Sequence, residues 1–150
     1  SPYKLSSRFI ETFHLSFATS KTVITPYYSF VEMRFFYDHF FRHGERTASE
    51  WFESLFNSYH QKTILPSVVI DFGTKKLRAL TYIQSLPLNR TAINRGALAV
   101  FIPENEFLRH LRGAHGQDDQ IVVRDAGGHI LISTLTVDPL VKTNNQLILI

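Results

Sequence analysis

The sequence contains no cysteine, and this absence excludes several kinds of site. Without cysteine there is no disulfide bond, no Cys-ligated zinc or iron–sulfur cluster, no Cys nucleophile and no flavin–cysteinyl photosensor. The chain also lacks a Gly-rich phosphate loop, a G-x-S-x-G nucleophile motif and an H-E-x-x-H zinc motif. The sequence therefore carries none of these short marks of an enzyme.

Long apolar runs and runs of more than two like-charged neighbours are absent too. No charge-free stretch approaches the roughly 18 residues that a membrane helix needs, and the first residues lack the basic-then-apolar layout of a signal peptide. The 16 Lys and Arg and the 13 Asp and Glu give a formal charge of +3, but these charges are scattered along the chain. A nucleic-acid-binding stripe is therefore not indicated, and we interpret the chain as a soluble piece of a longer protein.

The sequence does have enough apolar and aromatic material for a buried core. Of its 150 residues, 44% are apolar, and they include 13 Phe, 6 Tyr and one Trp. This length fits one domain, or one and a half small ones. We therefore expect an aromatic-rich folded protein rather than a disordered segment.

The N-terminal part of the chain predicts a β-hairpin followed by a helix. Residues 9–17 and 22–25 have strand patterns on either side of a turn-like segment. A helix is predicted over 30–41, ended by the glycine of residues 43–44. Its apolar face consists of residues at helical spacing, namely Phe30, Met33, Tyr37, Phe40 and Phe41.

A second helix is predicted over 47–59 by a capping box. Thr47 and Glu50 have the spacing at which a hydroxyl and a carboxylate each satisfy a free backbone amide at a helix start. One face of this helix is apolar and aromatic, with Trp51, Phe52, Leu55, Phe56 and Tyr59.

The rest of the chain is rich in strand patterns. A short amphipathic helix is predicted over 104–112, with Gly113 as its C-cap. Turns are predicted at 73–75 and 125–128. The predicted strands are 66–71, 77–86, 96–102, 121–124, 129–134 and 146–150. Because the strands are clustered rather than alternating with helices, the fold class is α+β with a mainly antiparallel sheet and helices packed on it.

Two groups of titratable residues have spacings that chemistry can use. His39 and His43 lie four residues apart on a predicted helix, and a third ligand such as His60 would complete a zinc site. The alternative is a pair of histidines at the surface or end of a helix, and we assign no metal. Asp118-Asp119 near His115 has the residue types of acid–base catalysis, but a solvated turn is the simpler interpretation.

A basic cluster occurs near the third predicted helix. It consists of Arg109, His110, Arg112 and His115. We interpret it as the exposed face and end of a short helix, with an anion site as the alternative.

Three residues are candidates for a ligand pocket. Trp51 either lines such a pocket or packs its helix onto the sheet. Tyr82 and Gln84 lie on the same face of a predicted strand because side chains alternate along a strand. A buried Gln beside a Tyr pairs either with the backbone or with a ligand.

Five segments of the sequence come in a familiar order. They are SKTVIT (20–25), TASEWFESL (47–55), LTYIQSLP (80–87), RGALAVFI (95–102) and VRDAGGHIL (123–131). Together, over roughly residues 8–135, they resemble the extracellular Cache-type, PAS-like sensor of membrane-spanning AraC-family transcription regulators in Gram-positive bacteria. Related sensor histidine kinases carry similar modules.

This resemblance implies a domain plan. Residues 1–112 would form the distal PAS-like subdomain, and residues 113–150 the start of a smaller membrane-proximal subdomain. The long leading helix of such sensors is not evident, and the proximal part looks unfinished, so we expect a truncated piece. We also expect residues 146–150 to pair with the 121–134 hairpin or to be buried in a dimer contact.

The resemblance implies a non-enzymatic sensor on the extracellular face of the cell membrane, without a cofactor. A small molecule or an extracellular protein would bind at Trp51, Tyr82 and Gln84, which would share a cavity under the helix 47–59, with Tyr28 as a further candidate. The amino-acid-binding signature of Cache domains is not evident, since Tyr28 and Arg34 are too loosely placed. The fragment itself would bind no nucleic acid, and it would reach the membrane only through flanking helices. Whether it forms a homodimer is left open. The alternatives are the sensor of a histidine kinase or chemoreceptor, or a small α+β enzyme or binding domain.

Overall fold

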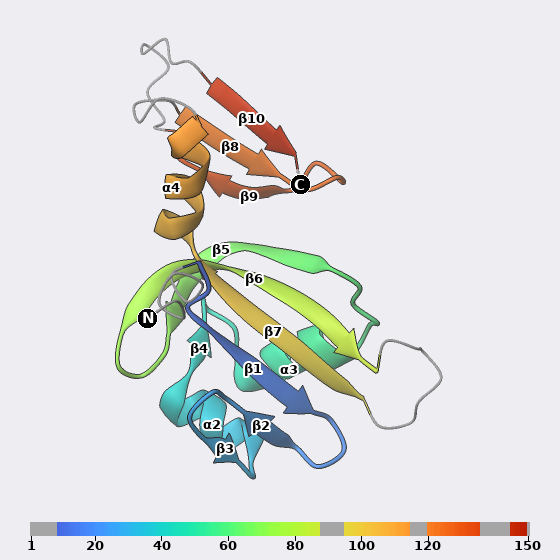
Figure 1. Cartoon of the computed structure of the whole chain (residues 1–150). Coiled ribbons are helices and arrows are strands. Elements are labelled where there is room, and N and C mark those ends of the chain that lie inside the picture. The colour runs from blue at the N-terminus through green and yellow to red at the C-terminus, as the bar shows by residue number, and fades with distance from the viewer. Residues whose placement is uncertain (1–8, 88–94, 115–119, 136–144, 150) are drawn as a thin grey trace.

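The computed structural model describes residues 9–87, 95–114, 120–135 and 145–149, which form an α+β fold with two sheets (Figure 1). The large sheet is antiparallel and curled, with strand order β3-β2-β1-β7-β6-β5-β4. Its strands are β1 (Thr12–Phe17), β2 (Thr22–Ile24), β3 (Ser29–Phe30), β4 (Arg42–His43), β5 (Thr63–Asp71), β6 (Lys76–Leu86) and β7 (Gly96–Pro103). The α+β class and the central antiparallel sheet predicted from the sequence are confirmed.

Three helices lie among the described residues: α2 (Met33–Phe40), α3 (Ala48–Phe56) and α4 (Glu104–Ala114). Helices α2 and α3 pack on one face of the large sheet, and α4 connects its last strand to the small sheet (Figure 1). No helix in the described part of the chain has the length and hydrophobicity to cross a membrane.

The predicted β1–β2 hairpin is present, but the first helix is shorter than predicted. Phe30 belongs to edge strand β3, where it pairs with Val23. Helix α2 starts after Glu32, whose carboxylate accepts hydrogen bonds from the Arg34 and Phe35 amides at 3.2 and 2.7 Å.

The helix also ends earlier than predicted, at Phe40. Phe41 is extended, with φ −155°, and its buried ring stays in the core while the chain turns into β4. Gly44, with φ +58°, therefore follows a strand and not the helix. Phe40, predicted on the apolar face of the helix, is 45% exposed.

The capping box of α3 is confirmed. The Thr47 hydroxyl accepts a hydrogen bond from the Glu50 amide at 3.2 Å, and the Glu50 carboxylate accepts one from the Thr47 amide at 3.1 Å. The hydrogen bond from the Thr47 amide, and then the contact with the Thr47 side chain, hold the pKa of the Glu50 carboxyl below its ordinary value. The helix buries Ala48, Trp51 and Leu55.

β6 and β7 match their predicted bounds to within one residue, whereas β5 starts at Thr63, three residues earlier than predicted. β6 pairs antiparallel with β5 on one side and with β7 on the other. The turn between β5 and β6 uses Gly73 at φ +85°, and the Gly73 amide donates to the Asp71 carboxylate at 2.8 Å. Gly113 does not cap α4 as predicted, because the helix continues to Ala114.

Two hydrophobic clusters lie on opposite faces of the large sheet. Ala79 and Ile83 of β6 belong to the cluster under α2 and α3. Leu80, which points to the other face, belongs to a second cluster with Leu108 of α4 and with residues of the small sheet. The two sheets therefore share buried contacts.

The small sheet has the order β10-β8-β9, from β8 (Gln120–Arg124), β9 (Ile130–Ser133) and β10 (Asn145–Leu149). β8 and β9 form the predicted hairpin, whose turn contains Gly128 at φ +86°. β10 pairs with β8 in parallel, which confirms the expected pairing with the hairpin and makes the small sheet mixed. The predicted boundary at residues 112–113 falls within α4, and the subdomain division stays a prediction.

Candidate functional site

Trp51 is a core residue in this fold. Its side chain is 1% exposed and stacks on the His43 ring, with centroids 4.4 Å apart and planes 17° from parallel. Phe41 and Phe101 lie at 5.6 and 6.4 Å from the indole. The indole therefore fastens α3 to the sheet.

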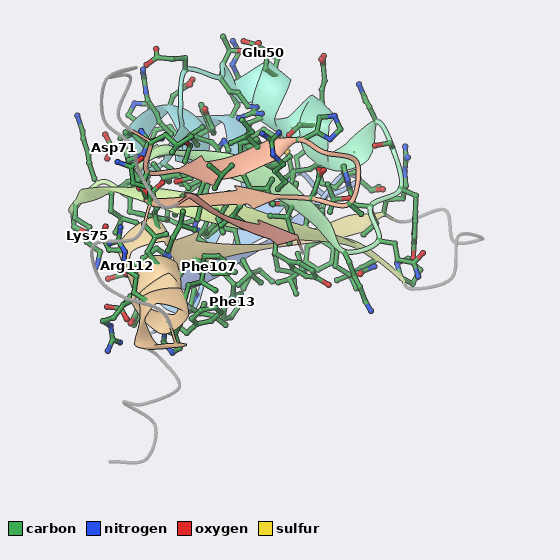
Figure 2. The ribbon with its side chains drawn as sticks, turned by 90° about the horizontal axis from the view of Figure 1, so that it is seen from above. Phe13, Glu50, Asp71, Lys75, Phe107 and Arg112 are labelled. Carbon is green, nitrogen blue, oxygen red and sulfur yellow. The ribbon has the colours of Figure 1, made fainter. Side chains whose placement is uncertain are left out.

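Tyr82 and Gln84 do not share a cavity with Trp51. They alternate with Ile83, which faces the α3 side, so they point to the opposite face of β6. Figure 2 shows these two sides of the sheet, with Glu50 of α3 on one and Phe13 on the other. The expectation of one pocket under helix 47–59 is therefore wrong. Trp51 lies on the α3 side of the sheet, whereas Tyr82 and Gln84 point to the opposite side.

The Gln84 side chain is paired with the backbone. Its amide donates to the His60 and Ser85 carbonyl oxygens at 3.2 and 3.0 Å, and its oxygen accepts from the Tyr82 hydroxyl at 3.5 Å. Of the two alternatives predicted for Gln84, pairing with the backbone or with a ligand, the structure shows pairing with the backbone.

Tyr28 does line a cavity, which lies beside α2. The cavity is open to solvent on one side, has a volume of about 650 Å³ and is bordered by β1, the β2–β3 turn, α2 and the β5–β6 turn. Its aromatic walls are Tyr27, Tyr28, Phe30, Phe36, Phe40 and Phe72. Its polar lining residues are Glu11, Thr12, His14, Thr25, Thr74 and Lys75. A volume of this size is typical of small-molecule sites.

His14 is the enclosed polar residue of this cavity. It is 5% exposed, and its ring lies edge-on to Phe36 and Phe41 at 5.0 and 4.6 Å. No described residue gives its buried Nδ1 a hydrogen-bond partner. Burial lowers the pKa of His14 from 6.5 to about 3, so the imidazole is neutral near pH 7.

The rim of the cavity carries an ion pair and two exposed tyrosines. Lys75 of the β5–β6 turn contacts the Glu11 carboxylate, so the two charges compensate each other. The Thr25 hydroxyl oxygen accepts from the Tyr28 amide at 3.1 Å and fixes a tight turn. This turn presents Tyr27 and Tyr28 at the surface, where they are 83% and 70% exposed.

His14 was not among the residues predicted for a site. The segment FHLSF has apolar residues at 13, 15 and 17, so its alternation places His14 and Ser16 on the solvent side. In the structure the polar pair faces the helices, and both residues are buried. A histidine among eleven aromatic residues within residues 9–41 is the signal that was available.

His39 and His43 do not form a metal pair. His39 lies in the last turn of α2 and its Nδ1 contacts the Phe35 carbonyl at 3.0 Å, whereas His43 lies in β4 and is fully buried. Across the described ranges no group of three or more His, Asp or Glu is placed to hold a metal ion.

His43 instead belongs to a buried network. Arg46 donates from Nη1 to His43 Nδ1 at 2.8 Å, so Nε2 carries the proton and donates to the Thr81 hydroxyl at 2.7 Å. Burial, and then the Arg46 charge, lower the pKa of His43 to about 3. The network joins β4 to β6.

Two of the basic residues of α4 are engaged within the helix, whereas the buried Nε of Arg112 has no hydrogen-bond partner among the described residues. Arg109 pairs with Glu106 at 2.6 Å, and His110 Nδ1 contacts the Glu106 carbonyl at 2.9 Å. His115, Asp118 and Asp119 lie outside the described residues.

Comparison of the chain with protein-family models, with curated proteins and with solved structures gives no match. The cavity beside α2 is therefore the candidate site on its geometry alone.

Proposed function

We propose that this chain is a non-enzymatic sensor domain that binds a small molecule in the cavity beside α2. The observation that carries the proposal is the enclosed imidazole of His14, whose Nδ1 has no partner among the described residues and which lies in an aromatic-walled cavity. Buried polar atoms in folded proteins are almost always paired. A ligand with a hydrogen-bonding group would supply that partner.

Binding is favoured over catalysis at this site. Glu11 and His14 both line the cavity and have the residue types of an acid–base pair. However, a histidine whose pKa is about 3 takes up no proton near pH 7, and Glu11 is already paired with Lys75. General acid–base catalysis works best when the pKa of the group lies near the working pH.

The finer proposal is that the domain belongs to a Cache-type, PAS-like sensor. Two features support it: helices on one face of a central antiparallel sheet, and a smaller β-unit after α4. On this proposal the domain lies on the extracellular face of the membrane and passes its signal to a cytoplasmic output domain. A histidine kinase or a chemoreceptor is the alternative to an AraC-type regulator as the output.

The mechanism of sensing would be a shift between two arrangements of the cavity walls. The cavity has walls from the β2–β3 turn and from the β5–β6 turn. A ligand held between them favours the arrangement in which both turns close on it. The size of the shift is limited by the difference in ligand affinity between the two arrangements.

A ligand screen by thermal unfolding tests the proposal. We expect compounds from a small-molecule library to raise the unfolding temperature of the unaltered chain and of Tyr82→Phe, whose change lies on the far face of the sheet. The increase should be reduced in His14→Phe and Phe72→Ala. At a hundred times its Kd a ligand adds about 2.7 kcal/mol of stability.

The proposal fails if no compound stabilises the unaltered chain. It fails equally if the compounds that stabilise it act with full effect on both cavity variants, because binding would then occur elsewhere.

A further inference from the structure

We infer that the ligand of the cavity is an uncharged molecule with a planar aromatic ring and one hydrogen-bonding group, which pairs with Nδ1 of His14. This inference rests on the proposed function and specifies its ligand class. It is carried by the walls of the cavity, by the unpaired nitrogen and by the charges at the rim.

The walls select a flat apolar ring. Phe30 lies against Phe36 and Phe40, with centroids 4.7 and 5.2 Å apart, so these rings form a continuous aromatic surface on the side of α2. Phe72 enters from the β5–β6 turn and Tyr28 from the β2–β3 turn. Aromatic pairs gain energy in offset-stacked and edge-to-face arrangements beyond the gain from burial.

The unpaired nitrogen selects a polar atom at one end of that ring. Nδ1 of His14 is unpaired among the described residues, and it is buried so fully that the imidazole must turn for this nitrogen to reach a ligand in the cavity. The aromatic rings next to the imidazole offer no conventional acceptor or donor. A neutral imidazole has one donor and one acceptor nitrogen. A hydroxyl is the most suitable group because it can serve either role.

The charges select against an ionic ligand. A charged group beside His14 would lose its water without meeting an opposite charge, because the imidazole is neutral there. At the rim, Glu11 and Lys75 contact each other, so neither is left as an uncompensated partner for a ligand ion. An ammonium or a carboxylate would have to break this ion pair.

Four probes of one shape test the inference: 2-naphthol, naphthalene, 2-naphthoate and 2-naphthylmethylammonium. Binding to the unaltered chain at pH 7 is followed by NMR, through the His14 imidazole nitrogen signals and the signals of the cavity aromatic rings. We expect 2-naphthol to bind about tenfold more tightly than naphthalene, the ratio for one well-made hydrogen bond. Both charged probes should bind more weakly than naphthalene.

The variants assign this preference to His14. In His14→Phe the advantage of 2-naphthol over naphthalene should disappear, while in Tyr82→Phe it should be unchanged. The ratios in the unaltered chain decide the ligand class even where His14→Phe does not fold.

The outcomes separate the two proposals. If a charged probe binds most tightly at the cavity signals, the ligand class is wrong but the cavity remains a binding site. If 2-naphthol and naphthalene bind equally, His14 does not select the ligand, and this inference is overturned. If no probe moves the cavity signals, this inference is also overturned, and the library screen then decides whether the cavity binds any ligand.

Discussion

Two buried histidines are the most unusual residues of this protein. Charged residues are rarely buried, and histidine is charged below its pKa, so burial holds both rings in the neutral form. His43 meets this demand with two hydrogen bonds, from Arg46 and to Thr81. Nδ1 of His14 has no hydrogen-bond partner among the described residues. One buried histidine is therefore paired through both ring nitrogens, and the other leaves Nδ1 unpaired.

These histidines predict a loss of stability in mild acid. Their pKa values are about 3 in the folded chain, against 6.5 ordinarily. Between these values the unfolded chain binds more protons than the folded chain, so stability falls as the pH decreases from 6.5 toward 3. Each histidine should contribute up to about 1.4 kcal/mol per pH unit to the free energy of unfolding, measured by urea denaturation.

Variants isolate the contribution of one ring. His14→Phe should lower the pH slope by about one proton, whereas Phe13→Leu, on the opposite face of the sheet, should keep it. Equal slopes in His14→Phe and the unaltered chain would show that His14 titrates normally in the fold.

Trp51 provides a second test at this scale. Trp51→Ala should cost roughly 3–5 kcal/mol in the free energy of unfolding, the range for a fully buried aromatic side chain. Denaturant unfolding followed by circular dichroism measures it, since the variant has no tryptophan. A loss below 1 kcal/mol together with impaired ligand response would instead support the predicted role of Trp51 in binding.

At the scale of the element, local signals in the sequence were sufficient where a short motif determines the backbone. The capping box of α3, the turns at Gly73 and Gly128, and the β1–β2 hairpin all follow from interactions between near neighbours in the chain. The ends of α2 did not follow from periodicity. The Glu32 cap and the pairing of β4 with β5 override the apolar pattern of residues 30–41.

The cap of α3 gives a prediction. Thr47→Ala removes the hydroxyl that accepts from the Glu50 amide, and should cost about 1 kcal/mol of stability. Thr47→Ser keeps an equivalent hydroxyl and should retain most of that stability. Urea denaturation compares the two, and an equal loss in both variants would point to packing of the Thr47 methyl group rather than to the cap.

At the scale of the whole molecule, the sequence predicted the order of the longer elements, but neither the two-residue strands β3 and β4 nor the way the faces of the sheet are used. The candidate site illustrates the limit. Tyr28 lines the cavity as one of the predicted residues, whereas Trp51, Tyr82 and Gln84 lie elsewhere. The cavity combines segments that are far apart in the sequence, so no local pattern reports it. The parallel pairing of β10 with β8 is also non-local.

The contact between the two sheets predicts how the chain unfolds. Leu80 of β6 is 1% exposed and packs in one cluster with Ile121 and Val123 of β8. Because this cluster spans both sheets, we expect one cooperative transition. Trp51 fluorescence, which reports on the large sheet, and the NMR amide signal of Val123 should have the same urea midpoint.

Leu80→Ala should lower both midpoints together, by about 2–5 kcal/mol of stability. Two separate midpoints in the unaltered chain would contradict this expectation and would support independent subdomains within residues 1–112 and 113–150.

One of the two short edge strands of the large sheet borders the cavity. β3 has only two residues, Ser29 and Phe30, and pairs only with β2 in the described sheet. So short an edge should open often, exposing its amides to exchange with solvent. A molecule held between Tyr28 and Phe72 would act as a removable cross-link between this edge and the distant β5–β6 turn. Ligand binding in the cavity should therefore slow amide hydrogen exchange at residues 28–30, even if the average positions of the atoms do not change.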